Sequence, residues 1–285
     1  HASLIDGCKI SKAKTVIYKH CDMEDLERKI ISFSKGMNQR MILTDSVFSM
    51  DGDIAPLDKI IELCKKYDCI SMIDEAHATG VLGKNGAGAS EFFNIEDKVD
   101  ICMGTLSKAI GSIGGYVAGS FDLIDFLKNK ARSFIFDTSL PASTLNASIS
   151  AIRIIRENNS IRENLSNNIK NLSNFLDENQ FPHFNSQTAI VPILIGGEKE
   201  TLKVSDSLLS NGVFIPAVRP PSVPAGKSRI RITLMALHKK KHMDRLFESL
   251  FSIKKMIDKT QRGSKIKAER GTKLLSKLDN DFEVF

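Results

Sequence analysis

The amino-acid sequence predicts an α/β fold, and two observations carry the prediction. Short apolar runs recur along the first half of the chain, as buried parallel strands require. Helical spacing lies between them, as in Leu57, Ile60, Ile61 and Cys64 behind the turn-forming "DGDIAPL". Strands in alternation with helices indicate a mainly parallel sheet covered by helices on both faces. A strand followed by a loop is expected over Met41–Met50, and further strands at Cys69–Ile73, Asp100–Gly104 and Gly114–Ser120.

The second half of the chain predicts a smaller α+β domain. A polar helical pattern runs from about Ala142 to Leu172. Beyond it, strands are expected at Ala189–Ile195, Val213–Ile215 and Ile230–Leu234, and helices at Thr201–Ser210 and Lys239–Ile257. The expected organisation is a large domain over residues 1–162, a small domain over 163–258 and a basic, loose tail over 259–285.

The composition is that of a globular protein. The 285 residues are 42% hydrophobic and 26% charged, and no apolar run approaches the ~20 residues of a membrane helix. No signal peptide is recognised at the start of the chain. The cysteines are five in number and show no CxxC spacing, so buried thiols in a reducing cytoplasm are expected, at Cys8, Cys21, Cys64, Cys69 and Cys102.

The C-terminal region concentrates the positive charge of the chain. Thirteen Lys and Arg residues against four acids lie between His238 and Lys277, while the whole chain has a net charge of +6. Such a segment can contact nucleic acid or an anionic surface. Its aromatic residues Phe247 and Phe251 fall on the apolar face of the expected helix, which favours a solvated helix over a nucleic-acid site.

Two charged residues follow apolar runs that should end at the same edge of the sheet. Asp74 closes "SMID", and Lys108 follows "DICMGTLS". Ligands of open parallel sheets bind at the carboxyl ends of the strands. There an amine can form a Schiff base, and a carboxylate can keep a pyridine nitrogen protonated. Taken singly, Lys108 could equally be a surface lysine and Asp74 a helix cap.

The "DEAH" stretch at Asp74–His77 also occurs as a metal-binding motif in helicases. That function requires an upstream phosphate loop, GxxxxGK[ST]. The GKS of this chain, Gly226-Lys227-Ser228, lies downstream and has Pro221 in place of the first glycine. The sequence therefore excludes a helicase.

Six stretches together resemble the α-oxoamine synthases, which condense an amino acid with an acyl thioester using pyridoxal phosphate. They cover residues 1 to about 257 in order: "HASLIDG", "TDSVFSMDGDIAPL", "IDEAHATGVLGKNGAG", "GTLSKAIGSIGGYVAG", "FIFDTSLPAS" and "VRPPSVPAGKSRIRITL". The resemblance implies an aminotransferase-like (fold type I) large domain. It also implies an N-terminal segment of roughly a hundred residues before "HAS", whose absence would expose sheet edges and weaken cofactor retention.

The resemblance implies a cofactor role for each of four residues around the ring. Lys108 would hold pyridoxal phosphate as a Schiff base and move the α-proton. Asp74 would pair with the pyridinium nitrogen, and His77 would donate a hydrogen bond to the phenolic oxygen, close to Ser49. A plain loop-capping role is the alternative for Ser49.

Four further roles follow from the same resemblance. His1 would stack on the ring, and Thr105 would bind the phosphate. Thr138 would reach the phosphate of a neighbouring subunit, which makes a homodimer the functional unit, and Arg231 would clamp the substrate carboxylate. The alternatives are an ordinary strand residue for Thr138 and a surface charge for Arg231.

Within the family, the double proline of "AVRPPSVPAGKSRIRITL" favours the enzymes that join L-alanine to a pimeloyl thioester, carried by coenzyme A or an acyl carrier protein, in biotin biosynthesis. Acetyl transfer to glycine by a related member is the alternative. Two other classes stay open: a non-catalytic subunit, against which Lys108, Asp74 and His77 argue, and a protein that binds nucleic acid through residues 259–285.

Overall fold

The computed structural model describes residues 1–33, 36, 39–184 and 186–278. It divides into two compact units: His1–Ser49 with Asp53–Leu165, and Met50–Gly52 with the residues from Ser166 onward. The sequence places the boundary between the large and the small domain after residue 162. This division into domains stays a prediction. Within the described residues, no helix is long and apolar enough to cross a membrane.

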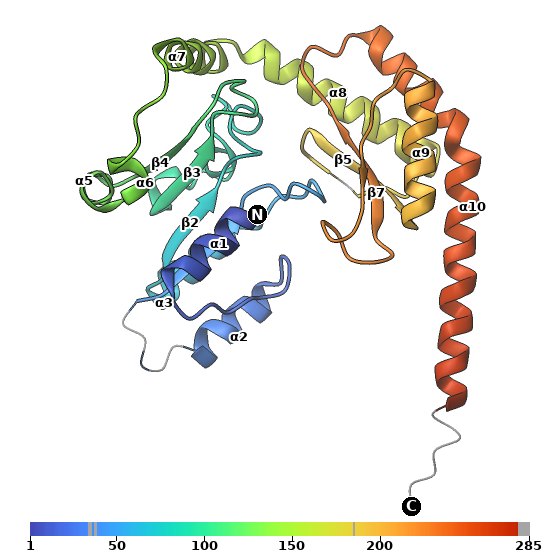
Figure 1. Ribbon diagram of the computed structural model, residues 1–285, viewed down its shortest axis with the longest axis horizontal. Coiled ribbons are helices and arrows are strands. Elements are labelled where there is room, and N and C mark those ends of the chain that lie inside the picture. Colours follow the sequence, from blue (N-terminus) through green and yellow to red (C-terminus); the bar gives the residue numbers. More distant parts are fainter. Residues whose placement is uncertain (34–35, 37–38, 185, 279–285) are drawn as a thin grey trace, which may run out of the picture. The chain divides into compact units, whose positions relative to one another are not determined.

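The first unit is built on a mixed sheet with the strand order β1-β2-β3-β4 (Figure 1). The strands β1, β2 and β3 are parallel, and β4 pairs antiparallel with β3. Their bounds are β1 Met41–Asp45, β2 Ile70–Asp74, β3 Ile101–Thr105 and β4 Gly115–Gly119. The strand expected at the start of Met41–Met50 is confirmed, and the other three expected strands agree with β2, β3 and β4 to within one residue at each end.

Helix α3 forms because its apolar residues recur on one face. Leu57, Ile60, Ile61 and Cys64 are all buried, and Pro56 precedes the first turn. Asp68 ends the helix in a left-handed conformation (φ 51°), and its N–H bonds to the Cys64 carbonyl. The helical segments of this unit are α1 Ala2–Ser11, α2 Met23–Phe33, α3 Leu57–Tyr67, α4 Ala89–Phe92, η1 Glu96–Lys98, α5 Phe121–Lys130, α6 Arg132–Ile135 and α7 Ala142–Glu157.

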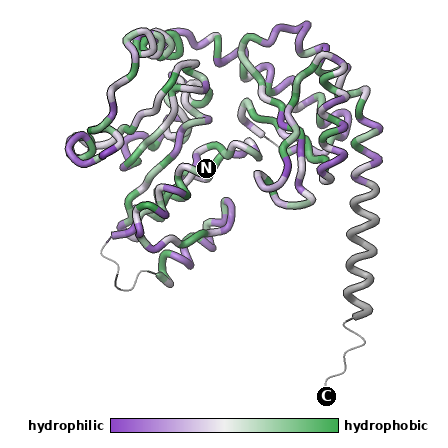
Figure 2. Tube along the Cα trace, viewed as in Figure 1, coloured by the Kyte–Doolittle hydropathy of each residue, from purple (hydrophilic) through white to green (hydrophobic). Residues whose placement is uncertain are grey.

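The second unit carries an antiparallel sheet with the order β5-β7-β6. Polar and apolar residues alternate along its helices (Figure 2), and the apolar side chains form a core that includes Leu172, Ile193, Leu208, Ile230 and Leu250. The bounds are α8 Asn159–Glu178 (which starts in the first unit), β5 Ile190–Gly196, α9 Glu198–Ser210, β6 Ala217–Val218, β7 Ser228–Thr233 and α10 Lys240–Leu278.

Two features of this unit differ from the sequence-based expectation. The prediction of a strand at Val213–Ile215 is wrong. The strand in this region is β6, which begins at Ala217, two residues after Ile215. Val213 N–H caps α9 at the Leu208 carbonyl, and the Ile215 carbonyl accepts from Ser205 Oγ (2.6 Å), so this segment is tied to α9. Helix α10 runs to Leu278, through most of the segment expected to be loose, whose end at 279–285 lies outside the described residues.

Candidate active site

The carboxyl ends of β1, β2 and β3 bring polar residues into one row. The parallel register places Asp45 beside Asp74, and Asp74 beside Met103. Thr105 ends β3, two residues past Met103. Because parallel strands end at a common edge, residues far apart in the chain face the same space.

A pocket of about 370 Å³ opens at this edge, within the size range of small-molecule sites. It contains five of the residues singled out in the sequence. Its lining is His1, Ser3, Asp45, Asp74, Ala76, His77, Met103, Gly104, Thr105, Ser107, Lys108 and Gly115. Asp74, His77 and Lys108, which were expected to meet at the ends of two strands, thus line the same pocket.

Asp74 is a buried carboxylate, with 4% of its surface exposed. Its Oδ1 accepts a hydrogen bond from the Ala76 N–H (2.9 Å). Burial raises its pKa, and Asp45 adds to the rise, whereas Ala76 and the charge of Lys108 lower it. A second cation at this carboxylate, such as a protonated ring nitrogen, would stabilise its charged form.

Glu75 holds the backbone between Asp74 and His77 in place. It is fully buried, and Ala89 N–H and Ser90 N–H donate to its two oxygens at 2.9 and 2.8 Å. Ser46 Oγ lies 2.9 Å from both Glu75 Oε2 and the Asp74 carbonyl. One carboxylate therefore connects the ends of β1 and β2 to the start of α4, and the pocket residues on either side of it gain a fixed backbone.

The loop after β3 presents Lys108. Leu106 N–H bonds to the Gly114 carbonyl, and Ser112 N–H bonds to the Leu106 carbonyl, which closes the loop. Gly111, at φ +68°, accepts the left-handed conformation that this turn needs, and its N–H bonds to the Lys108 carbonyl. Lys108 is solvent-exposed and lines the pocket, so its amine is accessible to a ligand there.

A pair of hydroxyl groups lies beside this lysine. Thr105 Oγ1 is 2.7 Å from Ser107 Oγ, and Ser107 N–H donates to Thr105 Oγ1. Hydroxyl and backbone N–H donors are the groups that bind phosphate oxygens in protein sites. Of this pair, only Thr105 was expected from the sequence. Ser107 could have been predicted as well, because its hydroxyl lies two residues further along a loop that folds back on Thr105.

Two further lining residues were missed. Asp45 follows an apolar run just as Asp74 does, and it lines the pocket beside Asp74. Ser3 Oγ lies 2.9 Å from His1 Nδ1, and this contact orients the His1 imidazole at the pocket. The pattern "MILTD" could have revealed Asp45, because the strand-end argument applies to it unchanged.

Three predicted site residues do not line this pocket. Ser49 lies in the loop after β1, and Thr138 is exposed between α6 and α7. Arg231 is on β7 in the second unit. The roles of Ser49, Thr138 and Arg231 remain predictions.

Comparison with known proteins identifies the family. The model of the aminotransferase class I and II family matches residues 1–250, and the chain belongs to this family. The fold is therefore that of the pyridoxal-phosphate-dependent, fold type I enzymes.

The similarity extends to particular members. An 8-amino-7-oxononanoate synthase of Lysinibacillus sphaericus is 49% identical over 255 residues, which are 90% of this chain and 65% of that protein. A serine palmitoyltransferase structure from S. paucimobilis, with bound PLP and myriocin, is 28% identical with a TM-score of 0.86, covering 90% of this chain and 65% of that one. A Francisella tularensis 8-amino-7-oxononanoate synthase structure is 30% identical with a TM-score of 0.77, covering 90% and 73%. The chain thus spans somewhat less than two thirds of the length of the Lysinibacillus sphaericus synthase.

The pocket residues fit pyridoxal phosphate, the cofactor of these relatives. They supply a buried carboxylate for a ring nitrogen, imidazoles for a ring and its phenolic oxygen, paired hydroxyls for a phosphate and an amine for an aldehyde. These groups line one space at the edge where such sheets bind ligands.

Proposed function

We propose that this chain belongs to an enzyme that condenses L-alanine with a pimeloyl thioester, with loss of CO₂, to give 8-amino-7-oxononanoate for biotin synthesis. The observation that carries the proposal is the gathering of Asp74, His77, Thr105 and Lys108 around one pocket. The 49% identity to the 8-amino-7-oxononanoate synthase of Lysinibacillus sphaericus supports this reaction within the family.

Pyridoxal phosphate, when bound, supplies an electron sink for the charge that develops on the amino-acid Cα. Asp74 would hold the ring nitrogen protonated, since its buried carboxylate is stabilised by a neighbouring positive charge. His77 would donate to the phenolic oxygen. Both side chains orient the ring, and the Glu75 hydrogen bonds fix the backbone that carries them.

The other end of the pocket would bind the phosphate and the ring face. Thr105 Oγ1, Ser107 Oγ and the surrounding loop offer hydroxyl donors to the phosphate. The imidazole of His1 would lie on the ring face, where Ser3 orients it through the contact at Nδ1. Ser49 would lie close to the phenolic oxygen. These contacts would hold the ring in one orientation.

Lys108 would bond to the cofactor aldehyde and, once an amino acid displaces it, accept the α-proton at Nζ. Its exposed position in the loop after β3 suits an amine that has to reach both the aldehyde and the α-proton. Arg231 would bind the substrate carboxylate through paired N–H donors. The acyl group would arrive as a thioester of coenzyme A or of an acyl carrier protein.

We further propose a cytoplasmic homodimer as the working form. The exposed position of Thr138 suits a residue that serves a neighbouring subunit. The cysteines form no disulfide in the described part of the chain, which suits a reducing compartment.

An absorbance titration with pyridoxal phosphate tests the Lys108 assignment. The native chain should develop the visible absorbance of a lysine Schiff base, and borohydride should fix one cofactor per chain. Lys108→Ala should show neither. Lys98→Ala, at an exposed position of η1 in the same unit, is the matched control and should behave as the native chain.

Amino acids added to the loaded protein test the substrate. L-alanine should change the spectrum at lower concentration than glycine or L-serine, and release of CO₂ should require a pimeloyl thioester. A Lys108→Ala protein that still forms the borohydride-reducible band would refute the site. A stronger response to glycine would refute the choice of substrate while leaving the site intact.

A further inference from the structure

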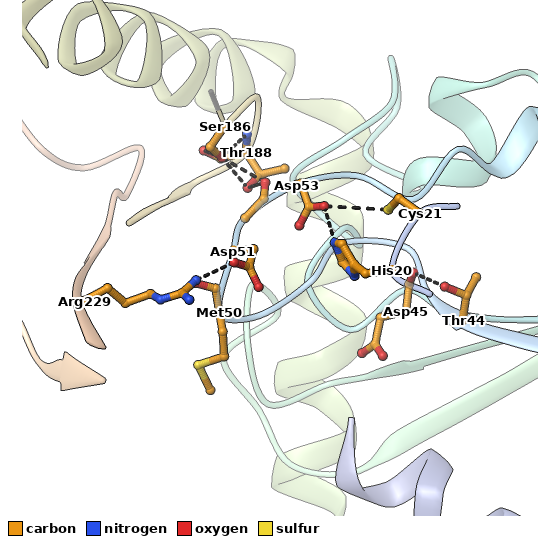
Figure 3. A network of polar contacts seen from close by, with 11 residues as sticks. His20, Cys21, Thr44, Asp45, Met50, Asp51, Asp53, Ser186, Thr188 and Arg229 are labelled. Atoms are coloured by element: carbon orange, nitrogen blue, oxygen red, sulfur yellow. Dashed lines mark hydrogen bonds and ion pairs between the residues drawn. The ribbon is translucent and has the colours of Figure 1, made fainter. Parts of the chain in front are cut away.

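A second cluster of potential ligands lies outside the candidate active site. His20, Cys21 and Asp53 present one nitrogen, one sulfur and one oxygen that all lie within 4.8 Å of one another. Figure 3 shows His20 and Cys21 converging on the Asp53 carboxylate. His20 Nε2 is 2.7 Å from Asp53 Oδ2, and Cys21 Sγ is 3.7 Å from the same oxygen. None of these three residues has a role in the proposed reaction.

The hydrogen bonds of the cluster leave one atom unexplained. Asp53 Oδ1 is shielded from solvent and has no hydrogen-bond partner in the described part of the chain. A buried carboxylate oxygen without a donor costs free energy, so it indicates a missing ligand. Cys21 is also held at φ 52°, a conformation that side chains other than Gly, Asn and Asp rarely adopt. In this conformation the Cys21 thiol lies beside the Asp53 carboxylate.

From this geometry we propose that His20, Cys21 and Asp53 bind a divalent transition-metal ion, with zinc as the best match. Imidazole, thiolate and carboxylate are the ligand types of zinc, and the thiolate and carboxylate together neutralise its two charges. Asp53 Oδ1 or a water molecule would complete the coordination, because His20 is exposed and leaves one side of the cluster open.

The distances are near those of a tetrahedral site. With bonds of about 2.3 Å to sulfur and about 2.0 Å to oxygen, the two atoms stand about 3.5 Å apart, close to the 3.7 Å observed. Nitrogen and oxygen would stand about 3.3 Å apart, so the imidazole must withdraw by about 0.6 Å from its hydrogen-bonded 2.7 Å. The exposed His20 side chain, which contacts only the edge of Phe48 among aromatic rings of the described residues, permits that shift.

The ion would join two distant segments of the first unit. His20 and Cys21 precede α2, and Asp53 precedes the turn into α3. Metal binding should therefore raise the melting temperature of the protein, because the unfolded chain lacks the assembled site.

Titration of the full chain with Co²⁺ alone tests the proposal. One equivalent should give the intense visible d–d bands of a tetrahedral ion, which lie to the red of cofactor absorbance, and one equivalent of Zn²⁺ should abolish them. Cys21→Ser should weaken binding at least tenfold and shift the bands, while Cys8→Ser, at another half-buried cysteine of this unit, should change nothing. Asp53→Asn should weaken binding but keep the sulfur-to-metal charge-transfer band.

Circular dichroism of each metal-free variant establishes that it folds. Absence of tetrahedral bands in the folded native chain would overturn the proposal, as would bands that persist unchanged in folded Cys21→Ser. An unaltered melting temperature with saturating Zn²⁺ would also contradict it. Because Lys108 takes no part in this site, Lys108→Ala should bind Co²⁺ normally, whether or not the proposed enzymatic function holds.

Discussion

Asp74 combines a charge that the proposed chemistry needs with burial that opposes it. Its pKa is raised by burial, so folding without the cofactor disfavours the charged form of this carboxyl relative to the unfolded chain. The resulting loss of stability is absent below the ordinary aspartate pKa of about 3.9 and grows as the pH rises through the raised folded value. The cofactor would reverse this balance by placing a cation beside the carboxylate.

We therefore expect opposite effects of Asp74→Asn on stability and on cofactor binding. At pH 7 the cofactor-free variant should resist urea at least as well as the native chain, because it loses a buried charge and retains an acceptor for the Ala76 N–H. Its affinity for pyridoxal phosphate should fall by about 10- to 100-fold, the worth of a charge-assisted hydrogen bond. Urea midpoints between pH 4 and 8, with and without cofactor, measure both. A native chain whose cofactor-free stability rises over this range relative to Asp74→Asn would contradict the prediction.

Glu75 shows how a residue outside the pocket controls it. The backbone N–H groups of Ala89 and Ser90 each donate to one oxygen of the Glu75 carboxylate. In Glu75→Gln, an amide N–H₂ would replace one of these oxygens and would face an N–H donor. Since the side chain is fully buried, we expect a loss of about 2–3 kcal/mol in the free energy of unfolding. Chemical denaturation measures it, with the exposed Glu96→Gln in the same unit as control. Equal stabilities of the two variants would show that Glu75 does not hold this backbone.

At the scale of the elements, the sequence predicts what local patterns determine. The strands β1, β2 and β3 are short apolar runs, and their parallel pairing makes Asp74, Thr105 and Lys108 neighbours without further information. Val213–Ile215 has the same apolar character but serves as the C-terminal cap of α9. Whether a short apolar segment forms a strand or caps a helix depends on the helix before it. The apolar pattern of the segment alone does not specify this.

The environment of Arg229 could not be predicted for a different reason. Its side chain is 3% exposed, and its guanidinium lies over the Phe184 ring. The guanidinium also donates to the Met50 carbonyl and the Asp51 carboxylate (Figure 3). Asp51 lies 178 residues earlier in the chain. Only the tertiary fold shows that, of two nearby arginines on β7, Arg229 ties the 50–52 loop to the sheet.

Asp51→Asn tests the contribution of this link. The buried guanidinium would lose its anionic partner but keep the Met50 carbonyl, and Asp51 is partly exposed, so we expect a loss of about 1–2 kcal/mol. Thermal unfolding followed by far-ultraviolet circular dichroism measures it. Asp206→Asn, at an exposed position on α9, is the control and should leave the midpoint unchanged.

At the scale of the whole molecule, sequence motifs predicted more site residues than line the pocket of the first unit. His1, Asp74, His77, Thr105 and Lys108 line one pocket because all of them belong to the first unit. Arg231 belongs to the second unit, and Thr138 is exposed on the first. Their proposed roles depend on arrangements beyond a single compact unit, which no local pattern specifies.

Mixed dimers can decide whether Thr138 serves a neighbouring subunit. Thr138→Ala should weaken cofactor binding by about tenfold, the loss of one hydrogen bond to a phosphate, whereas Ser133→Ala, exposed on α6, should not. Lys108→Ala should form no Schiff base.

When the two variants are co-expressed with different affinity tags, each heterodimer would contain one site with an intact Lys108 from one chain and an intact Thr138 from the other. That site should bind the cofactor with native affinity and react with L-alanine. If Thr138 acted within its own chain, every site of the heterodimer would carry a defect, and the purified heterodimer would bind no more tightly than Thr138→Ala alone.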